Sequence, residues 1–225
     1  MQAESPGAPP PRVKVHQGLR DALFPLLVAM AGGLAMTVIF EGRGNVVLAY
    51  ASHAWYLAAV GGWVLIFRLR FPLGGLSWQA LRGWFGPWFI VGGLYLLLAL
   101  VSPGPPLRHA ILAGLIFQGV VVGPTEEVLF RGLIQTTLNR VIGGAIPFGR
   151  LRWGTIVAAL TFGLAHLASL PHQSLGDTLA QVAFAAVVGL VLGHYYDRTQ
   201  NLWGAAILHN IIDLTSVLVP LLIVH

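Results

Sequence analysis

Long runs of apolar residues alternate with short polar loops along most of the 225-residue chain. Each run is close to or above the roughly 18–20 residues that a helix needs to cross a bilayer. The loops contain Gly, Pro or charged residues, which commonly end helices. The runs cover residues 22–40, 46–67, 84–101, 110–138, 153–170, 178–194 and 202–224. This pattern predicts an all-α, polytopic transmembrane helix bundle of about seven spans, within a range of six to eight.

Residues 1–17 differ from the rest because they are polar and rich in Pro and Gly. Such a segment cannot bury enough apolar surface to fold, so we expect a disordered cytosolic tail followed by one transmembrane domain at 18–225. Alternating the loops between two sides places ten Lys or Arg residues on the N-terminal side and only Arg43 and Arg108 on the other. Cytoplasmic loops carry this excess, so the N-terminus is predicted to be cytoplasmic in a multi-pass protein of the cell (inner) membrane.

Composition supports the membrane assignment and excludes other classes. The chain is 56% hydrophobic and 9% charged, with a mean hydropathy of +0.76, whereas soluble domains have about 25% charged residues. The net charge of +5 is spread over the loops, so we expect membrane lipids and no nucleic acid as partners. Cysteine is absent, which excludes disulfides and thiolate metal sites.

A few strongly polar side chains fall inside the predicted spans. They are Glu126, Glu127 and Arg131 in the fourth span, His166 in the fifth, and His209, Asn210 and Asp213 in the seventh. A charge at membrane depth costs roughly 2.5–3.5 kcal/mol, so such residues tend to be functional or paired. A lone buried His more often forms an interhelical hydrogen bond, and we interpret His53 and His194 as ordinary interface or loop residues.

Helical spacing separates the two adjacent glutamates. Glu127 and Arg131 are i,i+4 neighbours and can form a salt bridge, for which we favour a purely structural, orienting role. Glu126 lies about 140° round the helix from Arg131, so its carboxylate can face another partner. One carboxylate is thus expected to be neutralised and the other to be available for chemistry.

Depth in the membrane brings that carboxylate near residues of later spans. At 1.5 Å per residue from the cytoplasmic ends, Glu126 and His166 lie about 21 Å in, Asp213 about 18 Å and His209 about 12 Å. The i,i+4 spacing also lets the Phe162 ring pack against His166. These groups can bind a divalent metal such as zinc, which acidifies a water, or can activate the water directly as a general base. Both alternatives are open, and the possible metal ligands are Glu126, His166, His209 and Asp213.

Three motifs in this order resemble one known family. "EEVLFR" (126–131), "FGLAH" (162–166) and "HNIID" (209–213) are similar to the EExxxR, FxxxH and Hxxx(N/D) motifs of the CPBP family. These are the CAAX prenyl protease and bacteriocin-processing membrane proteins, also called Abi. The resemblance covers roughly residues 108–215, which would form the catalytic core.

The resemblance implies an intramembrane endopeptidase in which Glu126 and His166 activate water. His209 and the last position of the final motif would polarise the scissile carbonyl or bind metal. Prenyl-protein-processing members have Asn at that position, whereas this chain has Asp213, so Asn210 is an alternative donor. Whether the enzyme is metallo- or glutamate-type is open.

We therefore predict an intramembrane peptidase, a hydrolase that cleaves membrane-associated peptides or proteins. Two alternatives are a proton- or ion-coupled transporter and a non-catalytic immunity or scaffold protein of the same fold. The identity of the substrate, its prenylation and the oligomeric state do not follow from the sequence.

Overall fold

A computed structural model describes residues 45–75, 78–101, 111–146, 151–170 and 173–223, with isolated residues between 16 and 32. Nearly all of the predicted tail and most of the predicted span 22–40 lie outside the described residues. The rest of the pattern can be compared with the structure helix by helix.

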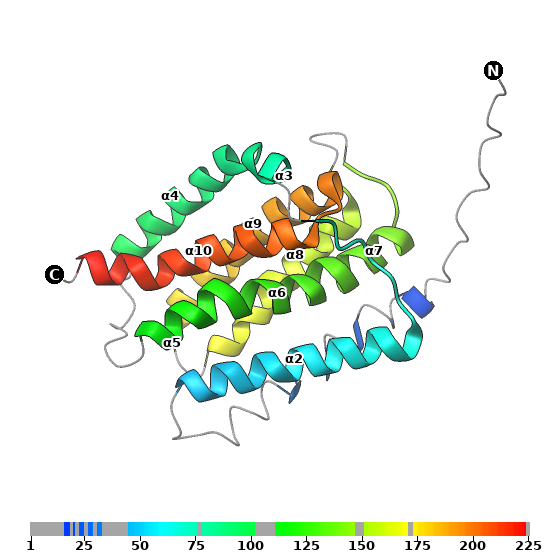
Figure 1. The fold of residues 1–225 in the computed structure, drawn as a ribbon, viewed down its shortest axis with the longest axis horizontal. Helices are drawn as coiled ribbons and strands as arrows, with labels where there is room; N and C mark the ends of the chain where they lie inside the picture. The colour runs from blue at the N-terminus through cyan, green and yellow to red at the C-terminus, as the bar shows by residue number, and fades with distance from the viewer. Residues whose placement is uncertain are drawn as a thin grey trace.

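Described residues form a helical bundle, with a single β-bridge between Ala145 and Arg152 in the part of the chain that the structure covers (Figure 1). The longer helices are α2 (Asn45–Phe67), α4 (Phe85–Val101), α8 (Trp153–Ala165), α9 (Leu175–Thr199) and α10 (Leu202–Ile223). A short α3 (Trp78–Arg82) precedes α4, and a 3₁₀ turn, η3 (His166–Ser169), follows α8. The all-α prediction is confirmed for these residues, and the helix bounds follow the predicted apolar runs closely.

The run predicted at 110–138 is one continuous helical stretch that alternates between α- and π-helix. Its parts are α5 (Ile111–Ile116), η1 (Phe117–Val121), α6 (Val122–Glu127), η2 (Val128–Gln135) and α7 (Thr136–Val141). Pro124 lies in α6 and has no N–H to donate to the preceding turn, so a widened π turn before it relieves the backbone. The two π segments η1 and η2 flank the glutamate pair, and such segments are frequent at functional sites.

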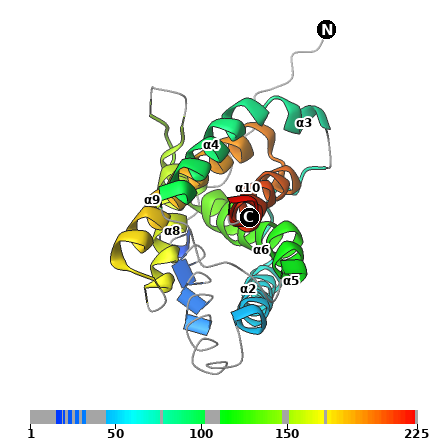
Figure 2. The same cartoon turned by 90° about the vertical axis from the view of Figure 1, so that its left-hand side faces the viewer.

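Helix α10 lies in the middle of the bundle, with α6 and α4 close beside it (Figure 2). Close approach to α6 depends on Gly123, because a Cβ there would lie 2.4 Å from both the Ala206 carbonyl oxygen and Asn210 Oδ1. The backbone N–H of Gly123 donates to Asn210 Oδ1 at 2.7 Å. These contacts fix the register between the helix that carries the glutamates and the helix that carries His209.

A second set of hydrogen bonds, centred on Asp197, joins η2, α7, α8 and α9 at one end of the bundle. The carboxylate of Asp197, in α9, accepts hydrogen bonds from Gln135 at 3.0 Å, from Asn139 at 2.9 Å and from the Thr155 hydroxyl. All three donors are buried. Because hydrogen bonds to a charged acceptor are stronger than neutral ones, this cluster should be a main determinant of how these helices pack.

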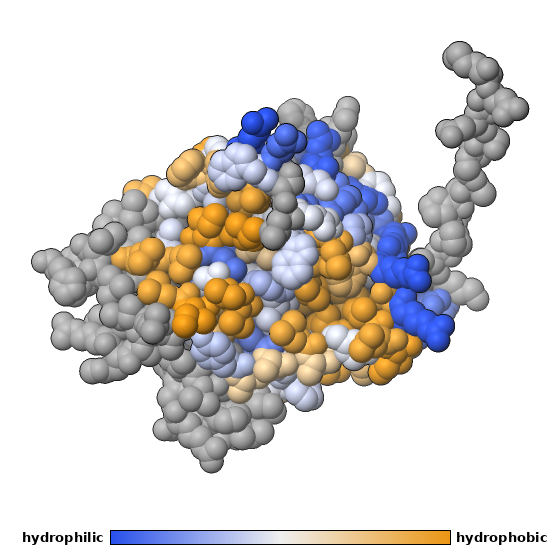
Figure 3. Space-filling view, viewed as in Figure 1, coloured by the Kyte–Doolittle hydropathy of each residue, from blue (hydrophilic) through white to orange (hydrophobic). Residues whose placement is uncertain are grey.

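The outer surface is rich in apolar side chains. Leu65, Ile66, Phe89 and Ile90 are each more than 70% exposed, and Figure 3 shows broad apolar areas between hydrophilic residues that gather along its upper and right-hand edges. Among the described residues, Leu175–Thr199 is a helix long and apolar enough to cross a membrane, with a hydropathy of 1.9.

Candidate active site

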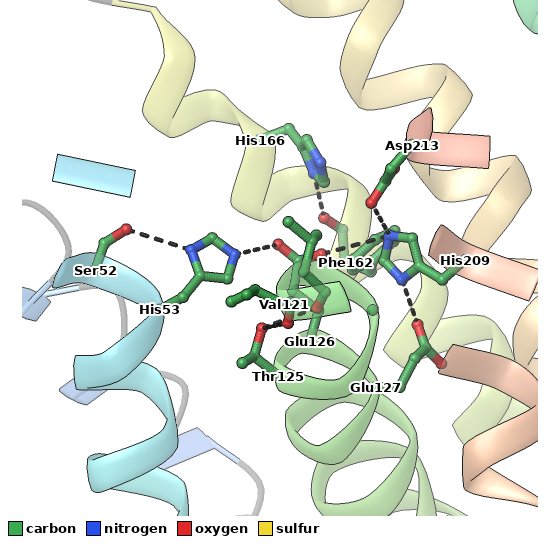
Figure 4. Close-up of polar contacts among 12 residues, drawn as sticks. Ser52, His53, Val121, Thr125, Glu126, Glu127, Phe162, His166, His209 and Asp213 are labelled. Carbon is green, nitrogen blue, oxygen red and sulfur yellow. Dashed lines mark hydrogen bonds and ion pairs between the residues drawn. The ribbon is translucent and has the colours of Figure 1, made fainter. Parts of the chain in front are cut away.

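Side chains from α2, α6, α10 and the end of α8 converge in the interior of the bundle (Figure 4). The two glutamates end α6, and His209 and Asp213 extend from α10. His166 begins the 3₁₀ turn after α8, and the structure also brings His53 of α2 to the same place.

Glu127 is the more deeply buried of the two glutamates and is held on both oxygens. Its Oε2 lies 3.0 Å from Arg131 Nε, and neither side chain is exposed. Its Oε1 accepts a hydrogen bond from His209 Nδ1 at 2.9 Å. The Phe162 ring lies against the guanidinium, with 4.9 Å between Arg131 Cζ and the ring centroid. The expected i,i+4 ion pair is therefore present, and Glu127 also connects it to His209 of α10.

Glu126 has a different environment. Its Oε1 lies 3.5 Å from His53 Nε2 and its Oε2 lies 3.8 Å from His209 Nε2. Its side chain is 15% exposed, whereas that of Glu127 is fully buried. Both separations are longer than a direct hydrogen bond, and such contacts in a substrate-free site often shorten when substrate binds. Glu126 is thus the carboxylate with room for a reacting molecule.

The imidazole of His209 connects the three carboxylates. Because a carboxylate oxygen can only accept, Nδ1 carries a hydrogen toward Glu127. This contact fixes the ring and turns Nε2 toward Glu126 and toward Asp213 Oδ2, which lies 3.4 Å away. The Phe162 ring packs edge-on against His209 with 5.6 Å between centroids.

His166 is oriented by its own helix. Its Nδ1 lies 3.0 Å from the carbonyl oxygen of Phe162, which can only accept, so Nδ1 carries the hydrogen. In the neutral ring, Nε2 is then the atom with a free lone pair. The Phe162 ring packs edge-on against this imidazole as well, at 5.2 Å. No hydrogen bond or ion pair joins His166 to Glu126 among the described residues. The two side chains belong to the same cluster without a direct polar contact.

Comparison with known proteins matches this region to one family. The model for type II CAAX prenyl endopeptidase Rce1-like proteins matches residues 108–215. The match spans just under half of the 225-residue chain, and over these residues the chain is similar to the Rce1-like family. The match confirms the predicted resemblance to the CAAX-protease-like family, and it supports a peptidase. No curated protein and no solved structure gives a significant match.

Within the Rce1-like region, Asn210 contacts the backbone of the helix that carries the glutamates. Its Oδ1 accepts from the Gly123 N–H, and the residue is only 9% exposed. This hydrogen bond joins α6 to α10, whereas Asp213 Oδ2 lies 3.4 Å from His209 Nε2. Which of the two contacts a substrate carbonyl stays a prediction.

The residue that sequence reasoning missed is His53, which lies outside the Rce1-like region. We interpreted it as an ordinary interface residue, but it lies beside Glu126. The available signal was an ionisable side chain in an apolar run of α2. No spacing rule links α2 to α6, so the sequence could not give its partner. By contrast, His194 of α9 contacts the Trp84 ring at 5.5 Å and takes no part in this cluster.

No group of three or more His, Asp or Glu side chains among the described residues has a geometry that could hold a metal ion. Glu127 and the Phe162 carbonyl oxygen engage Nδ1 of His209 and of His166, which leaves Nε2 of each ring as the atom that could bind a metal. The metal set Glu126, His166, His209 and Asp213 therefore stays a prediction for direct measurement.

Proposed function

We propose that the protein is an intramembrane endopeptidase in which Glu126 is the general base. One observation carries this: the structure separates two adjacent glutamates into one that is neutralised and one that is available. Arg131 and His209 hold Glu127 at 3.0 Å and 2.9 Å. Glu126 is partly exposed and lies between imidazoles from two different helices.

In the proposed reaction, Glu126 takes a proton from a water whose oxygen attacks the carbonyl carbon of the scissile peptide bond. His166 Nε2, with its lone pair, can accept a hydrogen bond from the same water and orient it. The proton on Glu126 then passes to the amide nitrogen as the C–N bond breaks. The products are a carboxylic acid and an amine.

The negative charge that develops on the carbonyl oxygen needs a donor. His209 in its doubly protonated form can donate from Nε2, because Glu127 already holds Nδ1. Preorganised donors of this type are often the largest single contribution to such a reaction. Asp213, at 3.4 Å from Nε2, would orient the imidazole rather than donate to the oxyanion itself.

The same proposal places the protein in the cell (inner) membrane with several spans and a cytoplasmic N-terminus. The excess of basic residues on one side, the exposed apolar residues and the apolar helix α9 support it. The substrate class we propose is a membrane-associated peptide or protein, with prenylated CAAX peptides as the first to test, because the matched family is described by that activity.

A proton-coupled carrier is a second candidate for one reason. His53, Glu126, His209 and Asp213 follow one another at 3.5, 3.8 and 3.4 Å and resemble a proton relay. Proton flux through liposomes containing the purified protein, in the absence of peptide, would favour the carrier. Absence of flux together with peptide cleavage would exclude it.

The deciding experiment is cleavage of a prenylated CAAX peptide by purified protein in lipid nanodiscs. Glu126→Gln should lower kcat by roughly 10²–10⁴-fold, the usual contribution of a general base. Asp177→Asn, an exposed residue of α9, is the control and should keep wild-type activity. If the Glu126→Gln protein cleaves as fast as the wild type, the proposal is wrong. Metal analysis, with activity measured before and after chelation, decides between the metallo- and glutamate-type mechanisms.

A further inference from the structure

The imidazole of His53 is held in a fixed place beside Glu126. Its Nδ1 lies 3.4 Å from the Ser52 hydroxyl oxygen. Phe117 of η1 packs edge-on against the ring at 4.7 Å, and Tyr56 lies tilted against it at 5.5 Å. With these contacts, Nε2 is directed at Glu126 Oε1. Turning the ring over would break the contacts with Ser52 and Glu126.

The helix that carries His53 is itself packed against the glutamate helix. Tyr56, Val60 and Val64 follow His53 at positions i+3, i+7 and i+11, which lie on one helical face. Val60 is 1% exposed, and the three residues pack in the core cluster that contains Leu129 of η2. The position of His53 relative to Glu126 is therefore set by buried apolar packing and not by the polar contact alone.

The two oxygens of Glu126 thus face imidazoles on opposite sides. His209 approaches Oε2 from α10, inside the Rce1-like region, and His53 approaches Oε1 from α2, outside it. A carboxylate that is contacted on one oxygen only can rotate about its terminal bond, because the energy of that torsion changes little over a wide range of angles. Imidazoles 3.5 Å from one oxygen and 3.8 Å from the other restrict this rotation.

We propose that His53 is a positioning residue for the Glu126 carboxylate, so that α2 completes a site whose other members lie within residues 108–215. This inference rests on the proposed function, because it needs Glu126 to act as the base. His53 would act through Glu126 by donating from Nε2 to Oε1. Loss of the donor should slow the chemical step more than it weakens substrate binding.

Two substitutions separate donation from packing. His53→Phe keeps a ring for the contacts with Phe117 and Tyr56 but has no donor. His53→Gln places an amide N–H the same number of bonds from the backbone as Nε2 and keeps the donor. His194→Phe is the matched control, because that histidine packs against Trp84.

In the peptide assay in nanodiscs, His53→Phe should lower kcat roughly 10–100-fold. A displacement of about 1 Å in a reacting group can slow the chemical step by up to about 10²-fold. KM should change little, His53→Gln should recover most of the lost rate, and His194→Phe should resemble the wild type. Wild-type kcat for His53→Phe would overturn the inference. So would a His53→Gln protein that is folded but as slow as His53→Phe.

The failure of this inference and the failure of the proposed function give different results. An inactive Glu126→Gln protein beside a fully active His53→Phe protein rejects only the role of His53. An active Glu126→Gln protein rejects both, since His53 then has no base to position. Thermal unfolding of Glu126→Gln, His53→Phe and the double variant, without substrate, tests the contact between His53 and Glu126 independently. Non-additive shifts in Tm support the contact, and additive shifts contradict it.

Discussion

Replacing Arg131 with Met tests whether the buried ion pair is the structural anchor of the site. Arg131 is fully buried, contacts Glu127 at 3.0 Å and lies against the Phe162 ring at 4.9 Å. Among the described residues its Nη1 and Nη2 have no hydrogen-bond acceptor. The charge is therefore stabilised mainly by Glu127, and the substitution leaves that carboxylate buried with His209 as its remaining partner.

The expected loss of stability follows from this environment. Removing one partner of a buried pair costs about 3–5 kcal/mol, because the other charge is left uncompensated. At roughly 2–4 °C per kcal/mol for a chain of this size, Tm should fall by about 6–20 °C. Arg140→Met is the matched control, because Arg140 lies further along the same stretch, is exposed, and donates to the Arg70 carbonyl oxygen. It should lose no more than about 1.5 kcal/mol, the usual net worth of a hydrogen bond.

A double variant separates charge from packing. Adding Glu127→Gln to Arg131→Met removes the stranded charge, while the amide oxygen can still accept from His209 Nδ1. The double variant should therefore be more stable than Arg131→Met alone. Thermal unfolding in detergent micelles, followed by circular dichroism, measures all four proteins. An Arg131→Met protein within about 1 kcal/mol of the wild type, far from the cost of an unpaired buried charge, would refute the reasoning.

Two further predictions concern the contacts that place the site helices. Gly123→Ala should lower both Tm and activity, because the added Cβ would meet Asn210 Oδ1 at 2.4 Å, whereas Gly114→Ala in the same stretch has open space and should be neutral in both assays. Asp197→Ala should destabilise the fold by roughly 3 kcal/mol or more in the same unfolding assay, since three buried donors each lose an acceptor worth about 1–3 kcal/mol. The control Asp177→Ala, at an exposed position, should lower the stability by less than half as much. Equal losses in the two variants would contradict the role of the Asp197 cluster.

Features fixed by local periodicity could be predicted from the sequence. The i,i+4 spacing predicted the contact between Glu127 and Arg131, because it depends only on the geometry of one helical turn. The apolar runs gave helix bounds within a few residues, and the run at 110–138 is indeed one continuous stretch. Estimates of depth brought polar groups of three spans to one region, but they placed His209 about 9 Å from the level of Glu126, whereas its Nε2 lies 3.8 Å from Glu126 Oε2.

Features that depend on packing between helices could not be predicted in the same way. Glu127 was assigned wholly to Arg131, but it also accepts a hydrogen bond from His209. Asn210 was considered as a donor to substrate, whereas its Oδ1 holds the Gly123 N–H. In both cases the sequence indicates that a polar group is buried, but the partner depends on which faces of α6 and α10 meet.

The position of His53 shows most clearly where local spacing ends and tertiary packing begins. Its distance along the chain from Glu126 is 73 residues, and the intervening loops do not fix how α2 lies against α6. What fixes it is the apolar face of α2, which buries Val60 against η2 and brings His53 to the glutamate. Spacing within one helix therefore determines which glutamate is neutralised. Packing between helices determines which groups surround the other, and this is why a region that carries all the recognisable motifs can still have a site completed by a helix outside it.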